Sequence, residues 1–258
     1  MHKTFLAALC GVVLSAGLAV PALAGDRLDN IVGTNTLRVG TPGDYWPFSL
    51  KKDGQFVGHD IELIEEIAGV FGWKVEFVQT SWKTMAGDLG SNKFDVVVGG
   101  ITRTPARILF ADFLPAYAPF GKVALVNIKN KDRFKKPEDL NQPDVRVIKN
   151  PGGTNEQYVL THLTKAQVTT HDKNFEIPGL IAAGKGDVMI TETAEALQYA
   201  RKYKELYAAY LDKPLTPVNY MGFMLPTDDS DFVRAMNYAW DLLDRRGEMK
   251  QLQVKWID

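Results

Sequence analysis

Two kinds of apolar pattern alternate along this chain. Short, almost wholly apolar runs, such as 94–98, 145–148 and 187–191, are typical of strands buried on both faces of a parallel sheet. Other segments repeat their apolar residues at helical spacing. Ile61, Ile64 and Ile67 would share one face of a helix over 60–71, with the acidic residues of that segment largely on the other face. Because strand and helix patterns alternate, the chain is predicted to be an α/β protein with a mainly parallel sheet.

The same patterns suggest a division into two lobes. A polar stretch over 129–139 opens the second lobe, so we predict that 25–120 and 215–258 form the first lobe and 121–214 the second. The run over 122–126 is predicted to be an extended strand that crosses between the lobes. Further strands are expected at 36–40, 73–78, 167–169 and 220–226, and further helices at 27–32, 85–91, 156–163, 177–183, 192–197 and within 232–256.

The N-terminus carries a different pattern. Lys3 precedes an apolar run over 5–20, and Ala22-Leu23-Ala24 forms a small-residue cleavage motif. This arrangement predicts a secretory signal peptide over 1–24, and no membrane anchor is expected because the run is short for a membrane span. The single cysteine, Cys10, lies inside this segment, so the exported chain is expected to form no disulfide and no cysteine metal site.

Composition and charge exclude several kinds of partner. The chain has 258 residues, of which 45% are apolar and 24% charged, as is ordinary for a globular protein. Removing Lys3 with the signal leaves 30 − 1 = 29 Lys and Arg residues against 31 Asp and Glu, a net charge of −2. This balance gives no reason to expect binding to nucleic acid or to an anionic membrane. The four histidines show no metal-ligand spacing.

A glycine-rich turn at 150–156 offers the first candidate chemistry. Asn150-Pro151-Gly152-Gly153-Thr154-Asn155-Glu156 follows a strand pattern and precedes a helix pattern. Glycines allow a close backbone approach, Thr154 could cap the helix, and the first N–H groups of the helix would face an anion. The plainer interpretation is a simple strand-to-helix turn with a good cap, and an isolated Gly-Gly-Thr favours that interpretation.

Two further segments contain residues that suit a carboxylate ligand. The turn over 41–48 holds Tyr45, Trp46 and Phe48, which could wall a pocket at the end of a strand or plug the space under a loop. Arg103 and Arg107 lie where a helix is expected to start. An arginine can bind a carboxylate through two parallel hydrogen bonds, although either residue could be an ordinary surface charge.

The motifs together resemble the periplasmic solute-binding proteins of the polar amino acid type. The resemblance rests on 43–48, Gly58-x-Asp60, Thr104-Pro105-Ala106-Arg107, Phe110-x-x-Phe113-x-x-x-Tyr117 and the glycine-threonine turn, which extend over most of the chain. It implies a two-lobed, type II-like periplasmic binding protein fold, with two crossing strands between the lobes and a small-molecule carboxylate bound between them.

The chain also resembles one enzymatic branch of that family, the cyclohexadienyl dehydratases, which act on prephenate and arogenate. The motifs behind this narrower resemblance are Thr41-x-Gly43-Asp44-Tyr45-x-Pro47-Phe48-Ser49, Thr80-Ser81-Trp82, 150–156 and Thr191-x-x-x-Glu195-Ala196. The resemblance implies that Glu195 is the general acid. From the sequence pattern alone, Glu195 would more often be a solvated helix residue.

The same resemblance implies the rest of the site. Arg107 would hold a substrate carboxylate with help from Thr102. The remaining residues expected to contact substrate are Trp82, Tyr45 and Asp44 from the first lobe, and Asn150, Thr154 and Asn155 from the second. No metal or organic cofactor is implied.

One position departs from the pattern of amino acid binders. Those proteins place an aspartate directly after the threonine that ends a strand, where it holds the ammonium group of the ligand; this chain has Glu192 there. Glu192 could pair with an ammonium or point away. The competing hypothesis is therefore a periplasmic binding protein that delivers an amino acid or related carboxylate to an ABC importer.

Overall fold

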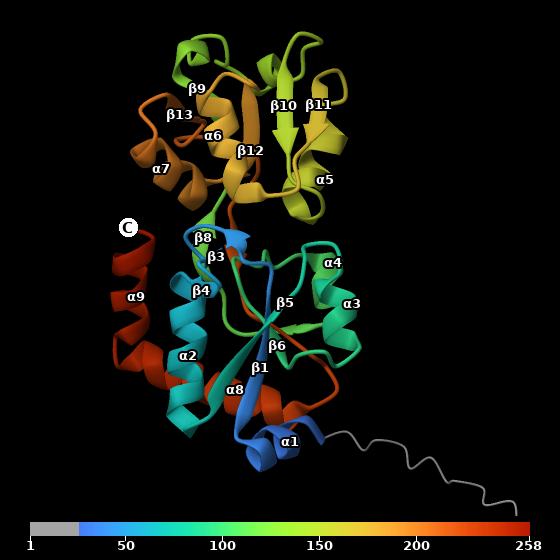
Figure 1. Cartoon of the computed structure of the whole chain (residues 1–258), viewed down its shortest axis with the longest axis vertical. Helices are drawn as coiled ribbons and strands as arrows, with labels where there is room; N and C mark the ends of the chain where they lie inside the picture. Colours follow the sequence, from blue (N-terminus) through green and yellow to red (C-terminus); the bar gives the residue numbers. More distant parts are fainter. Residues whose placement is uncertain (1–25) are drawn as a thin grey trace, which may run out of the picture.

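The computed structural model describes residues 26–258, so the predicted signal peptide and Cys10 lie outside the described residues. The described chain forms two α/β lobes stacked along the long axis of the molecule (Figure 1). This is the two-lobed binding-protein fold that the sequence predicts. Within residues 26–258, no helix is long and apolar enough to cross a membrane.

The first lobe is built on a mixed five-stranded sheet. Its strand order is β5 (Lys74–Gln79), β1 (Thr36–Thr41), β6 (Val96–Val97), β15 (Met224–Leu225) and β7 (Asp112–Phe113). β1 pairs parallel with β5 and β6, whereas β15 is antiparallel to both of its neighbours. A small antiparallel sheet of β2 (Asp44–Tyr45), β3 (Ser49–Lys52) and β4 (Gln55–Val57) follows β1.

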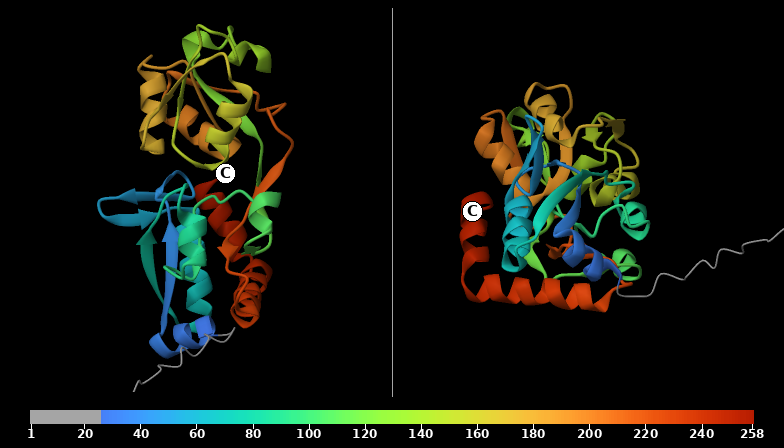
Figure 2. Two further views of the ribbon diagram at one scale, coloured as in Figure 1. Left: turned by 90° about the vertical axis from the view of Figure 1, so that its right-hand side faces the viewer. Right: turned by 60° about the horizontal axis from the view of Figure 1, so that its bottom comes forward.

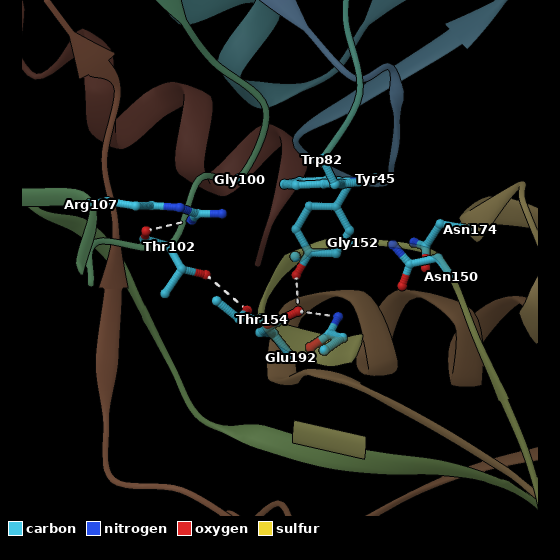
Figure 3. Close-up of a pocket in the computed structure, with 12 residues that line it drawn as sticks. Tyr45, Trp82, Gly100, Thr102, Arg107, Asn150, Gly152, Thr154, Asn174 and Glu192 are labelled. Carbon is cyan, nitrogen blue, oxygen red and sulfur yellow. Dashed lines mark hydrogen bonds between the residues drawn. The ribbon is translucent and has the colours of Figure 1, made fainter. Parts of the chain in front are cut away.

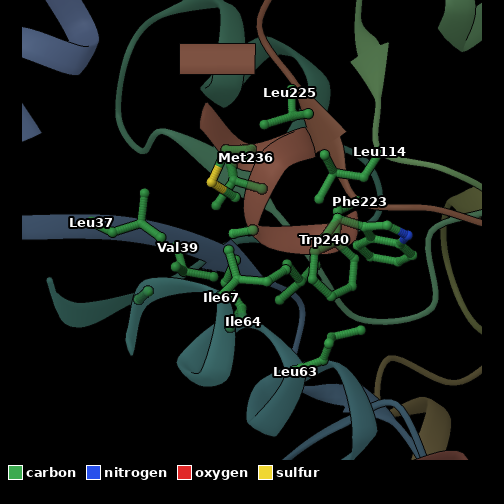
Figure 4. Close-up of a cluster of buried hydrophobic side chains, with 14 of the residues drawn as sticks. Leu37, Val39, Leu63, Ile64, Ile67, Leu114, Phe223, Leu225, Met236 and Trp240 are labelled. Atoms are coloured by element: carbon green, nitrogen blue, oxygen red, sulfur yellow. The ribbon is translucent and has the colours of Figure 1, made fainter. Parts of the chain in front are cut away.

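Within residues 26–258, six helices belong to this lobe: α1 (Asp26–Thr34), α2 (His59–Phe71), α3 (Met85–Gly90), α4 (Pro105–Ile108), α8 (Ser230–Arg245) and α9 (Glu248–Trp256). The predicted apolar face of α2 is confirmed, since Ile61, Ile64 and Ile67 are buried. They pack with side chains of β1 and α8, among them Val39 and Trp240 (Figure 4). This core fixes the end of β1, from which the aromatic turn extends.

The second lobe has its own five-stranded sheet, in the order β11 (Gln167–Thr170), β10 (Arg146–Lys149), β12 (Val188–Glu192), β9 (Lys122–Asn127) and β13 (Leu206–Ala209). β10 is parallel to β11 and β12, and β9 is antiparallel to β12 and β13. The helices α5 (Gly153–His162), α6 (Ile177–Ala182) and α7 (Thr193–Lys202) pack against this sheet. Three 3₁₀ turns lie at Ile128–Asn130, Pro137–Leu140 and Asn174–Glu176.

The connection between the lobes differs in detail from the prediction. An antiparallel pair, β8 (Tyr117–Phe120) and β14 (Asn219–Met221), runs between the lobes (Figure 2). The run over 122–126, predicted as a crossing strand, lies instead inside the second sheet as β9, where every residue is buried. An apolar run indicates burial on both faces but does not specify the neighbouring strands, which is why this prediction was wrong.

Candidate active site

A narrow hollow lies where the two lobes meet. Residues of both lobes line it (Figure 3): Tyr45, Trp82, Gly100, Thr102, Arg107, Asn150, Gly152, Gly153, Thr154, Asn155, Asn174 and Glu192. Eight of the ten residues that the sequence predicts for the site are on this wall. The other two, Asp44 and Glu195, lie directly behind it and bond to wall residues.

Aromatic side chains form the wall contributed by the first lobe. Tyr45 is buried, stacks on Phe48 at 5.4 Å and meets Trp82 edge-on at 5.6 Å. The indole Nε1 of Trp82 donates to Oδ1 of Asp44 at 2.8 Å. Burial raises the pKa of Asp44 to about 6. Asp44 therefore orients Trp82 from behind and carries its charge mainly above that pH.

Arg107 supplies a positive charge to the hollow. Thr104 caps the short helix α4 by accepting from the backbone N–H of Arg107, and the side chain of Arg107 donates to the carbonyl oxygen of Thr102 at 2.7 Å. Burial lowers the pKa of Arg107 to about 10, so the guanidinium stays charged at neutral pH. Within residues 26–258, no acidic side chain lies within ion-pair distance of it. This geometry suits a carboxylate from a ligand.

The glycine turn brings the N-terminus of α5 to the opposite wall. Gly152 has φ 80° and ψ 174°, a backbone conformation that is essentially confined to glycine. A Cβ on Gly152 would approach Cβ of Trp82 and the backbone nitrogen of Lys83, both at 3.1 Å across the cleft. Glycine is therefore required here both by the turn and by the contact between lobes.

The predicted cap by Thr154 was wrong. The helix begins at Gly153, three residues earlier than expected, which places Thr154 inside its first turn. The N-cap residue is Gly152, which has no side chain that could cap the helix. Instead, the carboxylate of Glu156 in the first turn accepts from the backbone N–H of Gly152 at 2.7 Å. The hydroxyl of Thr154 instead lies 3.4 Å from that of Thr102 in the other lobe.

Glu192 ends β12 and forms an ion pair that the sequence analysis missed. Nζ of Lys122, the first residue of β9, donates to Oε1 of Glu192 at 2.8 Å. The other carboxylate oxygen accepts from the hydroxyl of Tyr45 at 2.5 Å and from Nδ2 of Asn155 at 3.2 Å. Burial alone would raise the pKa of Glu192, but the charge of Lys122 and these hydrogen bonds hold it below its ordinary value. A lysine that opens an otherwise apolar strand was the signal available in the sequence.

Glu195 lies in the first turn of α7 and is fully buried, so the interpretation as a solvated helix residue was wrong. Its carboxyl group accepts from the hydroxyl of Thr191 and, at 2.8 Å, from Nδ2 of Asn174. Burial raises the pKa of Glu195 well above its ordinary value, and the nearby charges of Glu192 and Asp44 raise it further. A carboxyl group whose pKa is raised in this way holds its proton to higher pH than a free glutamate does and can act as a proton donor.

Asn174 joins this acid to the hollow and was also missed by the sequence analysis. It lies in the 3₁₀ turn after β11, is 2% exposed and is on the wall of the hollow. Its Nδ2 donates to Glu195 and to the backbone oxygen of Asp44, at 2.8 and 3.3 Å. Its Oδ1 is buried and has no hydrogen-bond partner among the described residues. This oxygen can therefore accept from a hydroxyl or ammonium group of a ligand.

Residues 26–258 contain no cluster of three or more histidine, cysteine or acidic side chains placed to hold a metal ion. The hollow combines the largely buried guanidinium of Arg107, the ion pair of Lys122 and Glu192, helix N–H groups and aromatic rings, and the buried carboxyl group of Glu195 lies directly behind its wall. Such a site can bind a carboxylate and transfer a proton to it or to a neighbouring group.

Comparison with known proteins places the chain in a family. Residues 37–258 match the family described as bacterial extracellular solute-binding proteins, family 3. A cyclohexadienyl dehydratase of Pseudomonas aeruginosa is 32% identical over 262 residues, an alignment covering 100% of this chain and 97% of that protein.

Two solved structures are also similar to this chain. One is an ancestral amino acid-binding protein described as a precursor of cyclohexadienyl dehydratase, with a TM-score of 0.82 and 35% identity over 90% of this chain and 99% of that one. The other is an ancestral cyclohexadienyl dehydratase, with a TM-score of 0.54 and 47% identity over 90% of this chain and 96% of that one. The family match covers almost all of the described residues, and the chain therefore belongs to the bacterial extracellular solute-binding proteins of family 3.

Proposed function

We propose that this protein is a cyclohexadienyl dehydratase, which converts prephenate to phenylpyruvate, arogenate to phenylalanine, or both. The observation that carries the proposal is the fully buried carboxyl group of Glu195, held by Thr191 and Asn174 directly behind the wall of the hollow. A buried acid with a raised pKa beside a cleft is typical of catalytic sites. The similarity to the Pseudomonas enzyme supports the same conclusion.

The reaction needs one proton donor. The bond between the ring and its carboxyl group breaks, and the bonding electrons enter the ring as CO2 leaves. The carbon–oxygen bond of the ring hydroxyl breaks as Glu195 gives that oxygen its proton, so that water departs. Glu195 is left as a carboxylate and regains a proton from solvent. The loss of hydroxide without this proton would be slow, which is where general-acid catalysis contributes.

The wall residues have separate tasks in this mechanism. Arg107 suits the side-chain carboxylate of the substrate, because an ion pair to the departing carboxylate would oppose its loss. Oδ1 of Asn174, which has no partner among the described residues, can accept the hydrogen of the ring hydroxyl and hold its oxygen toward Glu195. Tyr45 and Trp82 enclose the ring and exclude water. In the ligand-free cleft the acid is covered, and we infer that substrate brings the donor and the hydroxyl together.

The experiment is an assay of the mature chain with prephenate at neutral pH, following phenylpyruvate by absorbance. The Glu195→Gln variant is expected to lose about 10²–10⁴-fold in kcat while still binding substrate, because glutamine fills the same space but cannot act as an acid. Glu205→Gln, in the segment between α7 and β13, is the matched control and should behave like the unchanged protein. Turnover that survives in Glu195→Gln would move the acid to another residue.

The second candidate is a binding protein that delivers an amino acid or related carboxylate to an ABC importer. The observation favouring it is the TM-score of 0.82 with the ancestral amino acid-binding protein. If prephenate is not consumed above its spontaneous rate, a calorimetric screen against amino acids tests this candidate. Under either proposal we infer a periplasmic location, reached through the signal peptide predicted at 1–24.

A further inference from the structure

The charge arrangement around Glu192 bears on which ligands the hollow accepts. Among the twelve lining residues, Glu192 is the single acid, so it is the one lining carboxylate that could neutralise the charge of a ligand ammonium. Glu195 cannot replace it, because its carboxyl group is fully buried behind the wall, where Thr191 and Asn174 hold it. The question is therefore whether Glu192 is available to a ligand.

The ammonium group of Lys122 already pairs with Glu192, as the ammonium group of a ligand would. Its side chain is buried, and its nitrogen lies 2.8 Å from Oε1 of Glu192, 2.5 Å from Oδ1 of Asn155 and 3.1 Å from Oγ1 of Thr154. A lysine ammonium has three N–H donors, and here each has an acceptor supplied by the protein. Lys122 is therefore held in place and is not placed to bind a ligand carboxylate itself.

Both carboxylate oxygens of Glu192 already accept hydrogen bonds from protein groups. Oε1 accepts from Lys122, and Oε2 accepts from Tyr45 at 2.5 Å and Asn155 at 3.2 Å. The pair is neutral overall, while Arg107 and the N-terminus of α5 remain as positive features facing the hollow. A second ammonium placed here would be close to that of Lys122 and would find no uncompensated carboxylate.

We propose that Lys122 is an internal counter-cation that makes the hollow select ligands without an α-ammonium group, so that keto acids are preferred over the corresponding amino acids. That the preferred keto acid is prephenate and the disfavoured amino acid is arogenate rests on the proposed function. The preference for a ligand without an α-ammonium group rests on the contacts of Lys122 and Glu192 alone. Lys122 is a specificity-determining residue in this scheme and takes no part in the proton transfer.

The test uses pairs of compounds that differ only at this group. The ratio of kcat/KM for prephenate over arogenate is measured, together with the ratio of calorimetric affinities for phenylpyruvate over phenylalanine. Both ratios are expected to exceed about tenfold in the unchanged protein. Lys122→Met removes the cation, leaves Glu192 open to a ligand ammonium and is expected to move both ratios at least tenfold toward the amino acid.

Two further variants keep the test decisive. Lys74→Met removes an equal charge from an exposed residue at the start of β5 and should leave the ratios unchanged. If Lys122→Met fails to fold, the double variant Lys122→Met/Glu192→Gln removes both charges; it offers no carboxylate to an ammonium and should retain the preference for the keto acid.

The outcomes separate this inference from the proposed function. Equal affinity of the unchanged protein for phenylpyruvate and phenylalanine would overturn the inference, as would an unaltered ratio in folded Lys122→Met. A double variant that favours the amino acid would overturn it too. Absence of turnover with the expected binding ratios would reject the dehydratase and leave the ligand preference standing.

Discussion

Glu192 and Glu195 lie three residues apart at the junction of β12 and α7, and their surroundings drive their pKa values in opposite directions. Burial raises the pKa of both groups, but Glu192 faces the ammonium of Lys122 and its pKa ends below the ordinary value of 4.5. Glu195 has only neutral donors, Thr191 and Asn174, and its pKa ends well above 4.5. A pair of acids separated in this way is typical of sites that need one charged and one neutral carboxyl group.

This separation predicts opposite effects of two glutamine substitutions on stability. Between pH 4.5 and its raised pKa, the folded protein keeps the proton of Glu195 and the unfolded chain releases it. Each pH unit in that range therefore removes about 1.4 kcal/mol of stability, which Glu195→Gln should restore. The advantage of Glu195→Gln in melting temperature over the unchanged protein should grow as the pH rises from 4.5 toward the raised pKa of Glu195.

Glu192→Gln is the matched variant with the opposite sign. The lowered pKa of Glu192 means that its contribution is present above pH 4.5 and is lost as pH falls through the folded value. Removing its charge leaves Lys122 buried without a counter-ion, which should cost about 3–5 kcal/mol at pH 7. Melting curves of both variants and the unchanged protein at each pH provide the measurement. A Glu195→Gln variant that loses stability steadily with rising pH would show that Glu195 is not a buried neutral acid.

At the scale of elements, the start of α5 connects the second lobe to the first. The first N–H groups of a helix have no partner within it and can face a ligand. Gly152 lets that helix end approach Trp82 and Lys83, because no side chain intervenes. The turn is thus both part of the ligand site and part of the contact that closes the cleft.

Gly152→Ala is predicted to weaken ligand binding by at least tenfold. Its Cβ would press on Trp82 and Lys83 at 3.1 Å, and the backbone conformation would add about 1–3 kcal/mol of strain. Gly184→Ala is the control, since Gly184 also has a positive φ but no atom within 4 Å of the added Cβ. Calorimetry with phenylpyruvate should show a loss of affinity in Gly152→Ala alone, although both variants lose some stability. Equal affinities in the two variants would mean that the turn does not control closure.

The elements themselves were largely predictable from the sequence. Segments with a clear apolar pattern, such as the helical spacing over 60–71 and the apolar run over 187–191, formed α2 and β12 with bounds shifted by one residue. The neighbours of β9 were not predictable, because an apolar run carries no information about pairing. Lys122 and Asn174 were missed for a related reason. Each is a single polar residue outside any motif, and its place in the site depends on contacts with residues distant in sequence. Lys122 contacts Glu192, and Asn174 contacts Asp44.

At the scale of the whole molecule, the structure has the lobes in contact across the cleft. Tyr45 bonds to Glu192, and Thr102 lies against Thr154. The ancestral dehydratase is more similar in sequence than the ancestral binding protein, 47% against 35%, yet its TM-score is lower, 0.54 against 0.82. Higher sequence identity with a lower TM-score is expected where two proteins share the fold of each lobe but differ in the orientation of one lobe relative to the other. Such lobes close by rotation about a few connecting residues. In this protein the connecting residues are those of β8 and β14.

The segment 256–258 provides a further link between the lobes. Trp256 is fixed to the first lobe, because its Nε1 donates to Glu62 of α2 at 2.8 Å and its ring packs on Trp46 at 5.4 Å. From the second lobe, Gln198 of α7 donates to the carbonyl oxygens of Trp256 and Ile257, both at 3.2 Å. The side chain of Arg201, on the same helix, donates to the backbone carbonyl oxygen of Asp258 at 3.0 Å. These bonds form between the lobes and hold α7, the helix of Glu195, against α9.

We predict that the double variant Gln198→Ala/Arg201→Ala shifts the ligand-free protein toward an open form. Loss of hydrogen bonds worth about 1–2 kcal/mol in total corresponds to a roughly 5–30-fold change in the ratio of open to closed molecules. The radius of gyration from small-angle X-ray scattering should rise without ligand and return to the unchanged value when ligand saturates the cleft. Ligand affinity should fall by up to the same factor, because closure must then be supplied by binding. Gln251→Ala, on the exposed face of α9, is the control. If the double variant matched it in both scattering and affinity, the 256–258 segment would be only a packing contact and closure would depend on the cleft residues alone.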